Sequence, residues 1–71
     1  MKISARNQLK GKIIKIQKGA VNSILTLDIG GGNTITATIS CAAVKELGLE
    51  VGSDAYALIK ATSVMIGIDD E

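Results

Sequence analysis

The sequence of 71 residues predicts an all-β domain with one short helix. Most of the chain consists of short stretches rich in β-branched residues, which are separated by turns that contain glycine. Polar and apolar residues alternate most clearly in 21–29 and 33–40, and a helical period follows only after Ser40. At this length we expect a single domain that spans residues 1–71.

The first element is expected to be a long strand over residues 9–18, in which isoleucines supply β-branched packing and lysines occupy solvated positions. The alternation slips at the Ile13-Ile14 pair, which predicts a bulge or a strong bend. Such a bend lets one strand pass between two faces of a small barrel. Gly11 would ease the close approach of a neighbouring backbone, and residues 18–20 form a turn.

Two further strands form a predicted hairpin. In residues 21–29 one face carries Val21, Ser23, Leu25, Leu27 and Ile29. The turn at 30–33 (GGGN) tolerates the positive φ values of tight hairpins. A phosphate-binding loop is the alternative, but it needs a following helix and a lysine at fixed spacing, and here a strand follows. That strand, 33–40, alternates strictly between threonines or serine and apolar residues.

A helix of about two turns is expected over residues 41–48, with Ser40 as its N-cap and Gly48 as its terminator. Val44 and Leu47 would lie on its buried side. The next strand, 55–61, is apolar on both faces, so we expect the core on one side and the helix or another subunit on the other.

The C-terminal residues complete the predicted fold. Residues 63–68 are expected to form a short last strand, and 69–71 a solvated acidic tail. Five short strands with one helix after the third are what an OB-like five-stranded barrel contains. A core this small is marginal, and 46% of the residues are hydrophobic. We therefore expect subunit interfaces that bury apolar strand faces.

Composition argues against several classes of function. The chain has no histidine, and Cys41 lacks a base and a disulfide partner, so a small buried residue explains it better than a nucleophile. The carboxylates are more typical of solvated surface than of a metal site. A net charge of +1 and a single aromatic residue, Tyr56, argue against nucleic acid. With neither a transmembrane stretch nor a signal peptide, the expected location is cytoplasmic.

Anion binding is better supported, because cations and hydroxyls occur near both ends of the chain. Ser4 and Arg6 lie in the N-terminal run 3–8, and Lys60 precedes Thr62 and a further hydroxyl. Ser40 would supply another hydroxyl, beside the N-terminal amides of the predicted helix. A few charged donors, neutral hydroxyls and backbone N–H groups suffice to hold an ionised oxyanion. Taken alone, the N-terminal run is also compatible with an ordinary polar terminus, and the residues do not decide whether the two clusters converge.

The motifs resemble a known family. Residues 3–11 (ISARNQLKG) are similar to the opening signature of the molybdate-binding Mop domain. Residues 44–52, followed by 57–62 (ALIKAT), resemble its second half, in the same order and at matching spacing. A stand-alone Mop domain of this length resembles the molbindins, which are small cytoplasmic molybdenum-pterin-binding proteins.

The resemblance implies a non-enzymatic protein that binds and stores molybdate or tungstate. It implies a homohexamer, arranged as a trimer of dimers, with oxyanions between subunits and no nucleic-acid or membrane partner. The first kind of site would use Ser4, Ala5, Arg6, Lys60 and Ala61 from one subunit and Ser40 from its neighbour. The second kind would use the turn Lys18, Gly19, Ala20, Val21 and Asn22, mainly through backbone groups. Ala43 stands where some relatives have a serine, so one hydroxyl is absent from the first kind.

A function from another class remains as the alternative. An OB-like barrel also suits an interaction module that binds nucleic acid or a partner protein, although only the fold supports it.

Overall fold

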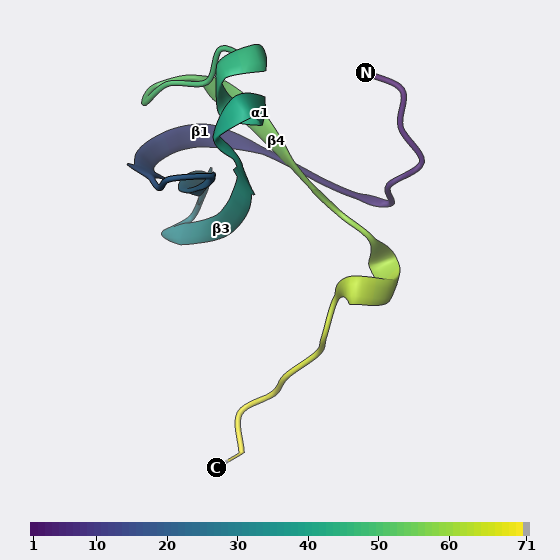
Figure 1. The fold of residues 1–71 in the computed structure, drawn as a ribbon. Coiled ribbons are helices and arrows are strands. Elements are labelled where there is room, and N and C mark those ends of the chain that lie inside the picture. Colours follow the sequence, from purple (N-terminus) through teal and green to yellow (C-terminus); the bar gives the residue numbers. More distant parts are fainter. Residues whose placement is uncertain (71) are drawn as a thin grey trace.

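The computed structural model describes residues 1–70, which form one curled antiparallel sheet with a short helix beside it (Figure 1). Its elements are β1 (Asn7–Lys18), β2 (Asn22–Gly30), β3 (Asn33–Ser40), α1 (Cys41–Glu46), β4 (Asp54–Ile59) and the 3-10 turn η1 (Ala61–Ser63). The strand order is β3-β2-β1-β4. The all-β, OB-like prediction is confirmed, but the described residues contain four strands rather than five.

The long strand β1 bends at the predicted bulge. Ile13 pairs with Leu27 and Lys15 with Thr26, which leaves Ile14 as the extra residue. The side chain of Ile13 is 2% exposed, whereas that of Ile14 is 48% exposed. Because of this bend, the first half of β1 pairs with β4 and the second half with β2, so β1 connects β4 to the β2–β3 hairpin.

The glycine-rich turn between β2 and β3 is a tight hairpin, as predicted. Gly31 and Gly32 have φ values of 63° and 79°, which glycine adopts without the cost that a Cβ would bring. The Gly30 N–H also donates a hydrogen bond to the Asp28 carboxylate, over 2.9 Å. The turn therefore closes a hairpin and leaves no phosphate-binding loop.

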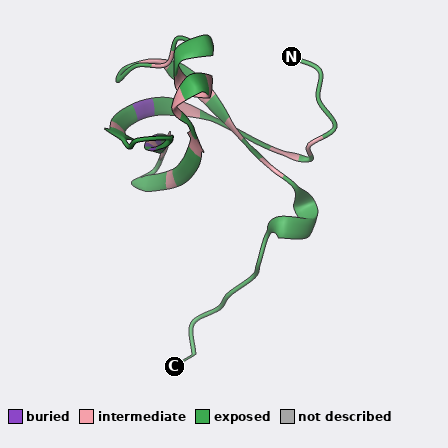
Figure 2. Ribbon diagram, in the orientation of Figure 1, coloured by how far each residue is buried: buried purple, intermediate pink, exposed green. Residues whose placement is uncertain are grey.

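The core lies inside the curl of the sheet and is small (Figure 2). Three apolar side chains are buried, namely Ile13, Leu25 and Leu27. Residues packed partly against them are Ile16, Ile29, Ile35, Ile39, Val44, Leu49, Ala55 and Ala57. The inward face predicted for 21–29 is confirmed from Ser23 onward, but Val21 is 72% exposed because β2 begins only at Asn22.

The helix is shorter than predicted. It ends at Glu46, and Leu47 is its C-cap rather than a helical residue. Leu47 is largely exposed, so the prediction that it lies on the buried side is wrong, while Val44 does pack against the core. Gly48, with a φ of 63°, terminates the helix in the left-handed region as predicted.

The C-terminal part of the chain departs most from the prediction. β4 ends at Ile59 rather than at residue 61, and residues 63–68 form no strand. A strand needs hydrogen bonds to a neighbour, and within the described residues no neighbour lies beside this segment, which extends away from the sheet (Figure 1). Asp69 and Asp70 are exposed, as expected for a solvated tail, whereas residue 71 lies outside the described residues.

Candidate oxyanion-binding site

Residues from the two ends of the chain line one hollow of about 390 Å³. The sheet register explains why they meet. Asn7, the first residue of β1, pairs with Ile59, the last residue of β4, so the segments just outside both strands lie together. The lining residues are Ile3, Ser4, Ala5, Arg6, Lys60, Ala61 and Thr62. Of the residues predicted for the first kind of site, all except Ser40 are thus brought together.

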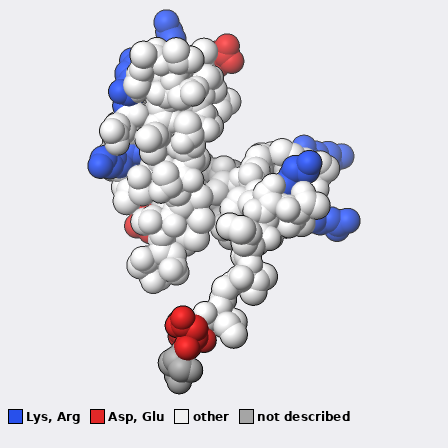
Figure 3. Space-filling model, turned by 60° about the horizontal axis from the view of Figure 1, so that its bottom comes forward, with Lys and Arg blue, Asp and Glu red and all other residues white. Residues whose placement is uncertain are grey.

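The hollow is suited to an anion by its charge. Arg6 and Lys60 both line it, and among residues 1–70 no carboxylate does. The one ion pair among the described residues joins Lys12 to Asp54 over 3.2 Å, so neither Arg6 nor Lys60 is neutralised by a carboxylate there. In the view of Figure 3, lysine and arginine atoms gather in two separate groups on opposite sides of the molecule. A guanidinium and an ammonium together provide directional donors and a compact charge.

Thr62 and Ile3 also line the hollow, although neither was included in the predicted site. The sequence did carry a signal for Thr62, because its hydroxyl follows Lys60 in the C-terminal donor cluster. The turn η1 places it: the Ser63 N–H donates to the Lys60 carbonyl over 2.9 Å, which brings the residues between them back beside Lys60. Ile3 supplies an apolar wall. It was missed because the prediction of the site looked only for residues that donate hydrogen bonds or carry positive charge.

Ser40 lies elsewhere in the molecule. It is the N-cap of α1, and its Oγ accepts a hydrogen bond from the Ala43 N–H over 3.0 Å. It does not line the hollow that Arg6 and Lys60 share. A hydroxyl has two lone pairs and one proton, so the cap leaves the Ser40 O–H free to donate.

The turn predicted as a second site is held against the start of α1. The Gly19 N–H donates to the Asn22 carbonyl over 3.0 Å, and the Cys41 N–H donates to the Val21 carbonyl over 2.8 Å. The Cys41 thiol donates to the Gly19 carbonyl over 3.3 Å. A side chain on Gly19 would meet the Asn22 carbonyl oxygen, so this close turn requires glycine.

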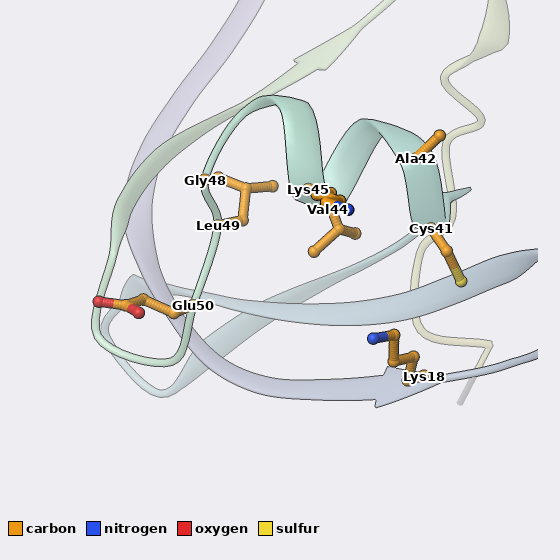
Figure 4. A pocket seen from close by; sticks show the side chains of 8 residues that line it. All are labelled: Lys18, Cys41, Ala42, Val44, Lys45, Gly48, Leu49 and Glu50. Carbon is orange, nitrogen blue, oxygen red and sulfur yellow. The ribbon is translucent and has the colours of Figure 1, made fainter.

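A second hollow, of about 640 Å³, lies next to this turn between β1 and α1 (Figure 4). Its lining residues are Lys18, Cys41, Ala42, Val44, Lys45, Gly48, Leu49 and Glu50. Of the turn residues only Lys18 reaches it. Cys41, expected to be a small buried residue, is half-buried here, and its sulfur lies 3.0 Å from the Ser23 hydroxyl. These contacts give the thiol a structural role in joining α1 to β2.

Comparison with known proteins relates the chain to molybdate binding. The family model of the TOBE domain matches residues 3–66. A probable molybdenum-pterin-binding protein of Haemophilus influenzae is 67% identical over 69 residues, which are 97% of this chain and 100% of that protein. The structure of MopII from Clostridium pasteurianum matches with a TM-score of 0.89 and 49% identity, over 94% of this chain and 100% of that chain.

A third comparison includes the ligand. The cytoplasmic molybdate-binding protein ModG, solved with molybdate bound, matches with a TM-score of 0.91 and 45% identity. The match covers 97% of this chain and 49% of ModG.

The chain therefore belongs to the TOBE domain family. Within that family its relatives of similar length are molybdenum-pterin-binding proteins, so the resemblance to the Mop domain is confirmed. These relatives are named as binding proteins rather than as enzymes, and the comparisons do not favour the alternative of an OB-type interaction module. Among residues 1–70 no helix is long and apolar enough to cross a membrane.

Proposed function

We propose that this protein binds molybdate or tungstate and stores it in the cytoplasm without chemical conversion. One observation carries the proposal: Arg6 and Lys60, from opposite ends of the chain, line one hollow to which the described residues contribute no carboxylate. The molybdate-bound relative ModG supports the identity of the ligand, and its description as cytoplasmic supports the location. The anion would bind by charge and hydrogen bonds, which fits a protein without histidine.

In the proposed first site, Arg6 donates through its guanidinium, Lys60 through its ammonium and Ser4 through its hydroxyl. Ala5 and Ala61 line the hollow without a polar side chain, so their contribution is through backbone N–H groups. Charged donors matter most, because a hydrogen bond with a charged partner is roughly twice as strong as a neutral one.

Ser40 completes this site from a neighbouring subunit. Within one chain Ser40 caps α1 and lies outside the hollow, so it reaches the same ion only from another copy. The site would then be shared by two subunits, and anion binding would stabilise the assembled form by mass action. Ala43 offers no hydroxyl there, which leaves Ser40 as the side-chain donor from that side.

Apolar surface supports assembly. The extended segment 64–68 (VMIGI) exposes Met65, Ile66 and Ile68 at 91%, 89% and 92%. The edges of the sheet, β3 and β4, flank an open hollow of about 450 Å³. Its lining includes the core residues Leu25 and Leu27 together with Met1, Ile13, Ile35, Ala37, Ile39, Leu47, Leu49, Asp54, Ala55, Tyr56, Ala57 and Leu58.

A monomer would leave both the segment and the hollow in water, at about 25 cal/mol for each Å² of apolar surface. Burying them between copies removes that cost. This surface supports assembly, and from the resemblance to the Mop domain we propose that the assembly is a homohexamer built as a trimer of dimers.

The second kind of site would lie at the turn Lys18, Gly19, Ala20, Val21 and Asn22 of several subunits around a three-fold axis. Three of its carbonyls are already engaged, since those of Gly19, Val21 and Asn22 accept hydrogen bonds within the chain. The Gly19 N–H is also engaged, by the Asn22 carbonyl, so the turn would contribute other N–H groups and the ammonium of Lys18.

Isothermal titration of the wild-type protein with molybdate, with sulfate as the control anion, tests the proposed function. We expect heat and saturable binding with molybdate and much weaker binding with sulfate, because the smaller ion leaves some donors unpaired. Light scattering on the same sample measures the solution mass, expected near six times 7.3 kDa. Equal binding of both anions would reject a selective molybdate site, and a monomeric mass would reject the shared site.

A further inference from the structure

We propose that Asn7 and Gln8 are positioning residues of the oxyanion site, which hold the peptide groups next to its two cations. This inference rests on the proposed function. The hollow is lined by residues 3–6 and 60–62, and neither Asn7 nor Gln8 is among them. Both amide side chains instead form hydrogen bonds to backbone carbonyls of residues in the lining or next to it.

The two hydrogen bonds follow the same pattern. The Asn7 Nδ2 donates to the Ile59 carbonyl over 3.2 Å, and the Gln8 Nε2 donates to the Ala5 carbonyl over 2.9 Å. The Ile59 carbonyl belongs to the peptide that precedes Lys60, and the Ala5 carbonyl to the peptide that precedes Arg6. Each amide thus holds the peptide group immediately before one cation.

A held peptide group restricts the cation that follows it. The peptide unit is planar, so a hydrogen bond to its carbonyl also orients the N–H on the opposite side and the next Cα. Long Lys and Arg side chains lose rotamer freedom when they bind, and a mobile backbone adds to that loss. Fixing both peptides before the ion arrives lowers the ordering cost of binding.

Electrostatic repulsion gives this restraint a further purpose. Without the anion, Arg6 and Lys60 are like charges that line one hollow, and their repulsion opposes keeping the two segments together. The pairing of β1 with β4 ends at Asn7 and Ile59, so no further ladder bond holds the segments beyond that point. The Asn7 side chain adds a bond at this last pair. It thereby links the residue after Arg6 to the residue before Lys60.

The test uses Asn7→Ala and Gln8→Ala in the full chain, with calorimetric titration of molybdate and sulfate. We expect Asn7→Ala to weaken molybdate binding roughly five- to tenfold, as for one lost hydrogen bond. Gln8→Ala should weaken it about two- to threefold, because its bond is exposed and water competes for it. A looser site should also lower the ratio of molybdate to sulfate affinity, which a purely structural role would leave unchanged.

Ser53→Ala is the matched control. In the wild type, the Ser53 hydroxyl accepts one hydrogen bond from the Glu50 N–H over 3.0 Å, at the opposite end of β4 from Lys60. The Ser53→Ala variant should lower the Tm of the free protein as Asn7→Ala does. Its affinity for molybdate and its selectivity over sulfate should stay those of the wild type. If Asn7→Ala does not fold, Gln8→Ala provides the same comparison, because Gln8 is exposed and its replacement disturbs the fold less.

Each outcome has a definite meaning. Loss of affinity and selectivity in the amide variants, with the control unchanged, supports the positioning role. If both amide variants bind molybdate with wild-type affinity in an assay in which Arg6→Ala binds weakly, the positioning role is overturned and the proposed function stays intact. A wild-type protein that does not bind molybdate overturns the proposed function, and this inference with it.

Discussion

Replacement of Arg6 by alanine removes one of the two cations that line the hollow. The guanidinium offers paired donors to an oxyanion, and a hydrogen bond to a charged group contributes about 1.5–3 kcal/mol. Arg6 is exposed in the single chain, so solvent screening places the loss toward the lower part of this range. About 2 kcal/mol corresponds to roughly thirtyfold weaker binding.

Two further variants separate geometry from charge. Arg6→Lys keeps the charge and loses the planar fork, so we expect a loss of about fivefold. Lys15→Ala removes one positive charge from β1 at a position that does not line the hollow, and it should change affinity less than twofold. The assay is isothermal titration with molybdate at fixed salt. An Arg6→Ala protein that binds like the wild type, or a Lys15→Ala protein that loses as much, would refute the assignment.

Three other perturbations address the shared site, the sheet and the assembly. Ser40→Asp retains an N-cap acceptor but places a carboxylate toward the anion, so calorimetry should show more than tenfold weaker binding of molybdate. The Tm should stay nearly unchanged, and unchanged affinity would exclude Ser40 from the site. Gly11→Ala puts a Cβ against the Asp28 carbonyl oxygen and should cost about 1–3 kcal/mol in urea unfolding, and a wild-type midpoint would contradict this packing. Ile66→Asp places a charge in the exposed apolar segment and should lower the solution mass measured by light scattering, whereas an unchanged mass would mean that this segment does not join subunits.

Local patterns in the sequence predicted those features of the fold that depend on a few adjacent residues. The doubled isoleucine at Ile13-Ile14 predicted the bulge, because it interrupts the alternation of polar and apolar residues along the strand. Three successive glycines predicted the hairpin, and Ser40 predicted the helix start. Each of these signals acts within one turn or one strand.

The errors arise where structure depends on neighbours beyond the local sequence. Residues 63–68 have a composition suited to a strand, but among residues 1–70 no sheet edge lies beside them. Leu47 is apolar and follows the helical period, yet α1 has already ended and the side chain faces solvent. In both cases the pattern predicts burial. Burial needs a neighbouring surface to pack against, and the described residues provide none at these positions.

The candidate site was predictable to a similar degree. Arg6 and Lys60 were recognisable as donors, but only the pairing of Asn7 with Ile59 places their segments together. Ser40 was predicted as a hydroxyl donor from its residue type, but its place on a neighbouring subunit came from the resemblance. Its location at the helix start explains why periodicity and spacing did not connect it to Arg6 within one chain. The hydrogen bonds of Asn7 and Gln8 depend on backbone positions that residue types do not reveal.

A crystal grown with molybdate and measured at the molybdenum absorption edge tests the central claim most directly. Anomalous scattering locates the metal independently of the protein coordinates. We predict a peak within hydrogen-bond reach of Arg6 and Lys60 of one subunit and of Ser40 from another. A fully occupied peak elsewhere, with Arg6 and Lys60 both directed into bulk solvent, would contradict the account.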